Sequence, residues 1–152
     1  MRAVLTLLVV ALAAGLAGCT AGAGTSNFEL RPERVGWFAG EEARFTLEIT
    51  PSLLERSPTF TIDRRFAIEE ISFEEKGVSF GGDYDTKDPD AVGLRLARGN
   101  QTADEFTLTP DEPRIDVYVT LPSDLRDSEY YLELKLFKVG WIESGAFRVD
   151  RI

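Results

Sequence analysis

From Phe28 to the C-terminus, hydrophobic and polar residues alternate with the two-residue period of β-strands. In residues 44–50 every second side chain is hydrophobic and those between are charged or polar, and residues 114–121 and 130–137 alternate in the same way. Such alternation is typical of strands that bury one face. Further segments expected to form strands are 28–31, 59–63, 66–75, 91–97, 104–109 and 145–152.

Glycine and proline separate these segments, and no long stretch has the 3.6-residue period of an amphipathic helix. Residues 52–57 and 122–129 are each expected to form one helical turn at most. Between Ile68 and Ile71 the hydrophobic face switches, as it does at a β-bulge. The many short strands predict an all-β fold, a single antiparallel β-sandwich over residues 28–152.

Two segments resemble parts of immunoglobulin-like and fibronectin type III-like β-sandwiches. FAGEEARFTLEI, residues 38–49, is similar to the glycine and acidic turn before their second strand, and LPSDLRDSEYYLELKLF, residues 121–137, is similar to their penultimate strand. The resemblance implies an immunoglobulin-like sandwich with a tyrosine corner. Alternation assigns that corner to Tyr130, on the face of Leu132, and leaves Tyr131 outside. No cysteine pair joins the sheets, so the domain would be a disulfide-free relative.

The N-terminus has the pattern of a secretory signal peptide. Met1 and Arg2 precede an apolar stretch that ends in small residues, which is the order found in such peptides. A membrane-spanning helix needs about 20 predominantly apolar residues, and this stretch is shorter and rich in alanine and glycine. We therefore expect residues 1–18 to be cleaved off.

The apolar stretch closes on LAGC, residues 16–19, which resembles the lipobox of prokaryotic lipoproteins at all four positions. The resemblance implies cleavage before Cys19 and attachment of lipid to its sulfur. The alternative, a free cysteine buried in a core, is disfavoured because Cys19 is followed by an uncharged spacer rich in glycine, alanine, serine and threonine. We expect residues 19–27 to be the lipidated cysteine and a flexible tether.

The net negative charge of the chain disfavours two classes of partner, nucleic acids and anionic lipid headgroups. The chain has 17 basic and 26 acidic residues, and removal of residues 1–18 takes away only Arg2, leaving 16 and 26 and a net charge of −10. This balance disfavours nucleic-acid binding, which needs cationic contacts to phosphates. It also repels anionic headgroups, so the lipid is expected to hold the protein at a membrane. The absence of histidine excludes a Ser-His-Asp triad and a His-ligated zinc site within this chain.

An aspartate-rich loop is the candidate metal site. GGDYDTKDPD, residues 81–90, contains Asp83, Asp85, Asp88 and Asp90. Calcium takes six to eight oxygen ligands, and closely spaced aspartates on a turning backbone can supply several of them. The spacing is not that of an EF-hand, and a solvated acidic loop explains the same residues, because aspartate and glycine tolerate turns.

Other chemical groups point less clearly to a site. Adjacent glutamates on a strand, such as Glu74 and Glu75, point to opposite faces and cannot act together on one substrate. Trp37 and Trp141 are expected to fill the core, and Tyr118 is the better candidate for an exposed aromatic contact. With no nucleophile, base and orienting group in a recognisable set, no enzymatic activity and no cofactor other than calcium is expected.

The sequence therefore predicts a lipoprotein of a prokaryotic cell envelope, bound to the membrane through Cys19, with its domain outside the cytoplasm. Its expected role is a non-catalytic interaction or structural one, with an envelope protein that the sequence does not identify. The alternative is a calcium-assisted module that binds a ligand or carbohydrate through the aspartate loop and exposed aromatic side chains.

Overall fold

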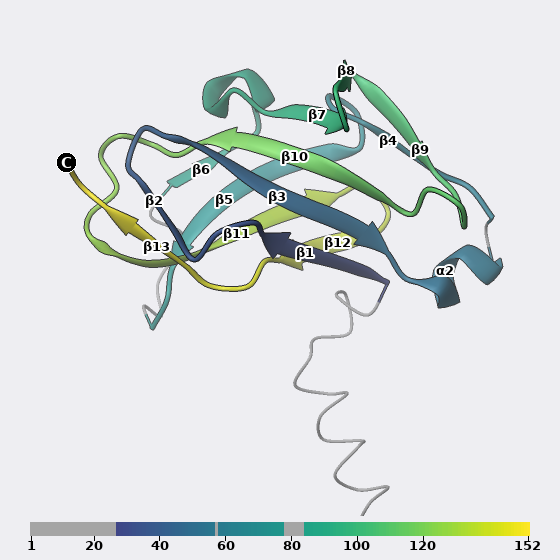
Figure 1. Ribbon diagram of the computed structural model, residues 1–152, viewed down its shortest axis with the longest axis horizontal. Helices are drawn as coiled ribbons and strands as arrows, with labels where there is room; N and C mark the ends of the chain where they lie inside the picture. The colour runs from purple at the N-terminus through teal and green to yellow at the C-terminus, as the bar shows by residue number, and fades with distance from the viewer. Residues whose placement is uncertain (1–26, 57, 78–83) are drawn as a thin grey trace, which may run out of the picture.

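The computed structural model describes residues 27–56, 58–77 and 84–152, which form a mainly-β domain (Figure 1). A short α-helix, α2, spans Pro51–Arg56, and a 3-10 helix, η2, spans Pro89–Val92. The prediction of a β-rich domain is confirmed. The strands are β1 (Phe28–Pro32), β2 (Gly36–Phe38), β3 (Glu42–Ile49), β4 (Phe60–Asp63), β5 (Ile68–Glu75), β6 (Tyr84–Thr86), β7 (Arg95–Arg98), β8 (Gln101–Ala103), β9 (Glu105–Leu108), β10 (Arg114–Thr120), β11 (Ser128–Leu136), β12 (Gly140–Glu143) and β13 (Phe147–Asp150).

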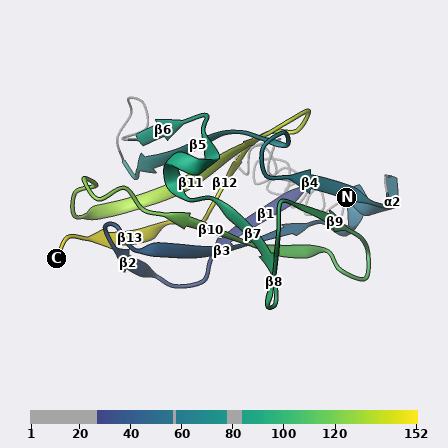
Figure 2. The same cartoon turned by 90° about the horizontal axis from the view of Figure 1, so that it is seen from above.

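The strands lie in two larger sheets and one small one. The first sheet has five strands in the order β1-β3-β10-β7-β8. The second has six, in the order β2-β13-β11-β5-β6, with β12 also paired to β11. Strands β4 and β9 form a separate pair. Figure 2 shows β3 and β7 of the first sheet on the opposite side of the domain from β5 and β6 of the second.

One strand pair departs from the predicted antiparallel arrangement. Strand β2 lies parallel to β13, with Trp37 opposite Val149, so the second sheet is mixed. The path of the chain explains the difference. Strand β1 pairs with β3 of the first sheet, and the chain then crosses to the second sheet without reversing, so that β2 continues in the direction that β13 also takes.

The pairing between β5 and β11 contains the predicted bulge. Lys135 lies opposite Glu70, but the next residue, Leu136, lies opposite Ile68. Glu69 is therefore the extra residue on β5, and the side chains that follow it change faces as a bulge requires. The prediction of a bulge between Ile68 and Ile71 is confirmed.

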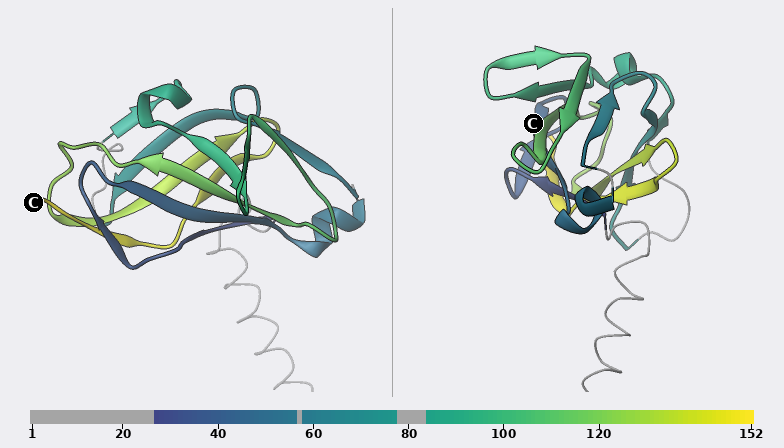
Figure 3. Two further views of the ribbon diagram at one scale, coloured as in Figure 1. Left: turned by 45° about the horizontal axis from the view of Figure 1, so that its top comes forward. Right: turned by 90° about the vertical axis from the view of Figure 1, so that its right-hand side faces the viewer.

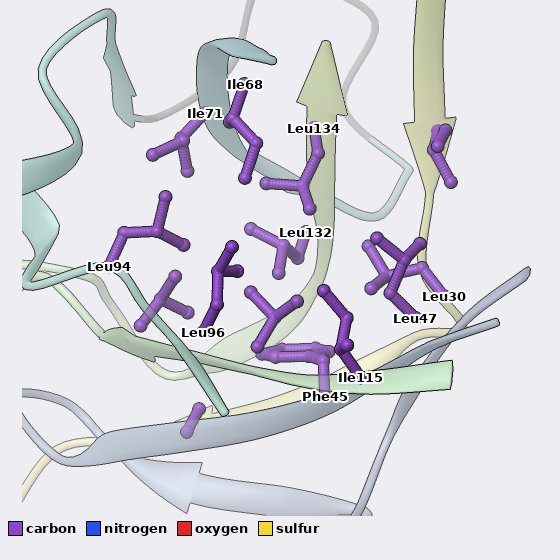
Figure 4. Packing of buried hydrophobic residues seen from close by; sticks show 14 of the residues in the cluster. Leu30, Phe45, Leu47, Ile68, Ile71, Leu94, Leu96, Ile115, Leu132 and Leu134 are labelled. Carbon is purple, nitrogen blue, oxygen red and sulfur yellow. The ribbon is translucent and has the colours of Figure 1, made fainter. Parts of the chain in front are cut away.

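The core lies between the two larger sheets. Phe45 and Ile115 from the first sheet meet Ile71, Leu132 and Leu134 from the second (Figure 4). Each of these side chains is at most 1% exposed. Burial of a large apolar side chain contributes about 1.5–3 kcal/mol, so this contact between the sheets is the main source of stability in a domain with no disulfide.

The pairing of β11 with different strands along its length defines two ends of the domain. Its second half pairs with β12 and its first half pairs with β13. A parallel bridge between Leu30 and Ser144 gives β1 and β12 the same direction, so both strands begin at the end that holds α2 (Figure 1). We call this the tether end. Figure 3 shows the C-terminus, which follows β13, at the opposite end, which we call the distal end.

Tyr130, which alternation along β11 places on the inner face, makes the kind of contact that the resemblance implied for a corner tyrosine. Its side chain is fully buried, and its hydroxyl donates a hydrogen bond of 3.0 Å to the backbone oxygen of Arg126. Arg126 in turn pairs with the carboxylate of Glu75, which is 8% exposed. The tyrosine therefore fixes the loop before β11 against the inner side of the second sheet.

Of the two predicted helical turns, the first is present and the second is not. Residues 52–56 lie in α2, as predicted, and Ser57 lies outside the described residues. Residues 122–127 form a turn and a bend and no helix, and Ser128 and Glu129 already belong to β11. Within the described ranges, no helix is long and apolar enough to cross a membrane.

The corner contact generates a prediction about stability. Replacement of Tyr130 by phenylalanine removes its hydrogen bond to the Arg126 oxygen but keeps the buried ring, so we expect a loss of about 1 kcal/mol in the free energy of unfolding. Urea denaturation measures this loss. The matched control is Tyr131→Phe on the outer face of the same strand, with a change below about 0.5 kcal/mol. Equal effects of the two substitutions would contradict the assignment.

Candidate functional site

Two of the predicted site residues, Cys19 and Asp83, lie outside the described residues. Asp85 lies on β6, where it is exposed and opposite Ser72 of β5. A hydrogen bond with Asp85 raises the pKa of Glu70 above its ordinary value, and the charge of Asp85 adds to this effect. Asp85 therefore belongs to an acidic row on the outer face of the second sheet.

Asp88 and Asp90 have local structural partners. The Asp88 side chain caps η2 by accepting a hydrogen bond of 2.9 Å from the backbone nitrogen of Asp90. The Asp90 carboxylate pairs with Arg64 and, at 3.3 Å, with Arg65. The hydrogen bond from Arg64 holds the pKa of Asp90 below its usual range. These contacts fasten η2 to the turn before β5.

Among the described residues, Asp85, Asp88 and Asp90 do not form a group of three carboxylates that could hold one metal ion. Asp85 faces outward from the second sheet, whereas Asp88 and Asp90 are held at η2. Because Asp83 lies outside the described residues, calcium binding by this loop stays a prediction.

The adjacent glutamates Glu74 and Glu75 point to opposite sides of β5, as the strand geometry predicted. Glu75 is buried against Arg126, and Glu74 lies on the outer face of the second sheet. The two carboxyl groups therefore do not act as a pair.

A different group of carboxylates comes together on that outer face. Glu74 of β5, Glu133 of β11 and Glu143 of β12 have carboxylate oxygens within 4.8 Å of one another. Glu133 lies directly opposite Glu143, and Glu74 lies opposite Tyr131, two residues from Glu133 on the same face of β11. We call these three residues the carboxylate cluster. Within the described ranges it is the one such group that could hold a cation.

Sequence reasoning missed this cluster. Alternation identified Glu133 as an outward position, but β12, which carries Glu143, was not predicted, and the meeting of the three residues depends on the register between three strands. The bulge at Glu69 and the β11–β12 turn set that register, and neither can be placed to the residue from alternation alone.

The pKa of Glu133, the central residue of the carboxylate cluster, is raised. Partial burial raises the pKa of Glu133 to about 8, and a hydrogen bond with Glu74 together with the charges of Glu74 and Glu143 adds to the rise. The raised pKa favours the protonated form of Glu133, whose carboxyl group is hydrogen-bonded to Glu74 and Glu143. A proton that is held in this way keeps three carboxyl groups together without a metal ion.

The two tryptophans have different environments. Trp37 is 4% exposed and packs against Phe45 and Phe147 in the core, as predicted. The prediction that Trp141 is also a core residue is wrong, because Trp141 is 39% exposed. Trp141 lies opposite Lys135 on β11, and both side chains point outward, while the next residue on β12 points inward.

Tyr118, the expected surface aromatic, is half-buried on the outer face of the first sheet. The guanidinium carbon of Arg95 lies 3.7 Å from the centre of its ring, and that of Arg44 lies 5.9 Å from it. Arg95 is also held by Glu42. The ring is therefore stacked under arginine in a charge network and does not offer an open face to a ligand.

The exposed large hydrophobic side chains of the described residues gather at the two ends of the domain. At the tether end they belong to the turns next to β5 and β11 and to β12. At the distal end they belong to the start of β2, its last residue and the C-terminus. The first group is Phe66, Phe137 and Trp141, and the second is Val35, Phe38 and Ile152.

A cleft of about 500 Å³ lies beside α2. Its lining combines apolar residues with three glutamates and contains neither a lysine nor an arginine. The lining residues are Glu29, Glu48, Ile49, Thr50, Pro51, Leu54, Glu55, Pro110 and Pro113. Of these glutamates, Glu48 is paired with Arg31 and Arg114.

No protein-family model matches the chain, and no curated protein matches it in sequence.

The carboxylate cluster generates a prediction about pH. Because the pKa of Glu133 is higher in the folded state than its ordinary value of 4.5, the folded state holds more protons, and its stability falls as pH rises from about 4.5 to 8. Glu133→Gln removes this ionisation. We expect it to flatten the pH profile and to raise the melting midpoint at pH 8.5 by a few degrees, the size expected for about 1 kcal/mol after allowance for solvent screening.

The matched control is Glu129→Gln on the same face of β11, where Glu129 pairs with Lys76 at 3.4 Å. Glu74 and Glu143, whose charges act on Glu133, and Lys135, at the next outward position of β11, stay unchanged in both variants. Melting curves between pH 5 and 9 test the prediction, and it fails when the Glu133→Gln profile keeps the wild-type slope.

Proposed function

We propose that the chain is a lipid-anchored lipoprotein of a prokaryotic cell envelope, and that its folded domain has a non-catalytic interaction role. The observation that carries the proposal is the LAGC sequence ending in Cys19, placed after an apolar segment and before an uncharged spacer. The folded domain follows directly after that spacer, since β1 begins at Phe28.

Lipid attachment explains how a strongly acidic domain stays at a membrane. A single acyl chain gives marginal binding, whereas two or more make anchoring stable, at about 0.8 kcal/mol per buried CH₂. With Cys19 used for lipid, no thiol is left to form a disulfide. The hydrophobic contact between the sheets then has to stabilise the domain alone.

We further propose that the domain is an immunoglobulin-like sandwich. Support comes from the first segment, which divides between the two sheets as β1 and β2, and from the parallel pairing of β2 with the last strand. The hydrogen bond from Tyr130 to the backbone oxygen four residues earlier matches the tyrosine corner of that family.

The distal end is the surface that we assign to a protein partner. Among the strands that the structure describes, β2 is an edge strand of the second sheet and pairs with β13 alone. Val35 is 91% exposed and Phe38 is 52% exposed on this edge. An ion pair of 2.6 Å between Arg34 and Glu41 lies beside them. An edge strand with exposed hydrophobic residues and a charged border suits the addition of a strand from another protein.

The anchor is tested by Cys19→Ala in cells labelled with a fatty acid. We expect the variant to lose the label and to leave the membrane fraction, because the sulfur that carries the lipid is gone. Thr20→Ala is the matched control, with labelling and fractionation unchanged. A Cys19→Ala protein that still carries label and sediments with membranes would refute the proposal.

The partner surface is tested with a photo-reactive amino acid in place of Phe38 and, in a control protein, in place of Thr102 on the exposed strand β8. We expect irradiation of intact cells to join the first protein to another envelope protein and to leave the control free of adducts. Adducts at both positions, or at neither, would count against the β2 edge as the contact.

A further inference from the structure

Three exposed aromatic side chains at the tether end do not belong to the proposed partner surface. Phe66 is 80% exposed, Phe137 is 53% exposed and Trp141 is 39% exposed. Lys138 stands beside them, with its ammonium nitrogen 5.4 Å from the centre of the Phe137 ring. We call these four residues the aromatic tip. Monomeric proteins rarely expose so many large apolar side chains together unless the group meets another surface.

The turns that carry the aromatic tip are held firmly in place. In the turn before β5, the carboxylate of Asp63 accepts hydrogen bonds from the backbone nitrogens of Arg65 and Phe66. The two turns are joined by a backbone hydrogen bond of 2.8 Å from Phe137 to the oxygen of Ala67. The tip is therefore a preformed surface.

Lys138 occupies an unfavourable backbone position at the end of the β11–β12 hairpin. Its φ of 63° is the one positive φ of a non-glycine residue in the described part of the chain. Glycine or asparagine suits such a position better. Among the described residues, no carboxylate lies within ion-pair distance of Lys138. The ammonium group of Lys138 therefore lies at the tip although its backbone conformation is unfavourable for lysine.

The aromatic tip faces the side from which the chain comes. Strands β1 and β12 run in the same direction, with Leu30 opposite Ser144. Phe28 lies two residues before Leu30, whereas Gly140 lies four residues before Ser144, so the hairpin reaches roughly 7 Å further than the start of β1, at about 3.3 Å per residue. Both strands begin at the tether end (Figures 1 and 3).

The spacer keeps this end close to the anchor. Nine peptide units separate Cys19 from Phe28, and nine extended residues span at most about 30 Å. When lipid on Cys19 lies in a bilayer, the tether end of the domain is therefore never far from the headgroups.

We propose that the aromatic tip rests in the interfacial layer of the same bilayer that holds the Cys19 lipid. This inference rests on the proposed lipid anchor. Trp141 would sit at the level of the headgroups, where its amphipathic ring is favoured, the two phenylalanines would reach the boundary with the acyl chains, and Lys138 would meet lipid phosphates. The contact would hold the domain with its distal β2 edge pointing away from the membrane.

The strong net negative charge does not prevent this contact. The tip is too small to bind a membrane by itself, and the net charge of −10 would oppose it. The tether turns the contact into an intramolecular one, at an effective concentration in the millimolar range. Under that condition a few aromatic side chains and one cation suffice to orient the domain.

The two tryptophans provide the test, since Trp37 is buried and Trp141 belongs to the tip. The full-length acylated protein is reconstituted into phosphatidylcholine vesicles, with or without bromine on the acyl chains near the headgroups. We expect brominated lipid to quench the wild-type fluorescence and to leave Trp141→Phe, which keeps only Trp37, nearly unquenched. Lys138→Gly, which suits the positive φ, should reduce the quenching of Trp141, and Phe38→Ser at the distal end should not.

Flotation of the vesicles separates the possible failures. Protein that does not float with vesicles lacks a working anchor, and that result overturns both the anchor and the tip proposal. Protein that floats but shows equal quenching in the wild type and in Trp141→Phe keeps the anchor and overturns the tip proposal. A blue shift of Trp141 emission without bromine quenching indicates burial against protein, and it also overturns the proposal.

Discussion

Every second side chain of β11 is buried in the core, and this constraint fixes the register of the strands that pair with β11. Tyr130, Leu132 and Leu134 point inward and close the contact with the first sheet. Their neighbours must then point outward, and Glu133 falls between carboxylates that β5 and β12 supply. Since β11 is paired along both edges, the register of three strands cannot shift without unpacking the core.

The same strand separates the two ends of the molecule. Its first half holds β13 and, through it, β2, while its second half leads into the hairpin with β12. The chain begins β1 at the hairpin end, so the hydrophobic surface near the tether and the hydrophobic β2 edge face opposite ways. We propose that one surface serves the membrane and the other a partner, which gives the short spacer a role in orientation as well as attachment.

Alternation along the chain was sufficient to predict the β-rich fold, the bulge near Glu69 and the inward position of Tyr130, because each depends on local periodicity. It was insufficient for strands as short as β2 and β12, in which three or four residues leave too little pattern. Trp141 was misplaced for that reason. The carboxylate cluster forms through pairing between strands that are far apart in sequence, and local alternation carries no information about that pairing.

Hydrogen–deuterium exchange on the acylated protein tests the orientation most directly, since it reports both ends in one experiment. The comparison is between the acylated protein on vesicles and the same protein in detergent micelles too small to present a flat surface. The account predicts slower exchange of backbone amides in residues 64–67 and 137–141 on vesicles, with no change in residues 34–38. Protection of residues 34–38, or no difference at either end, would contradict it.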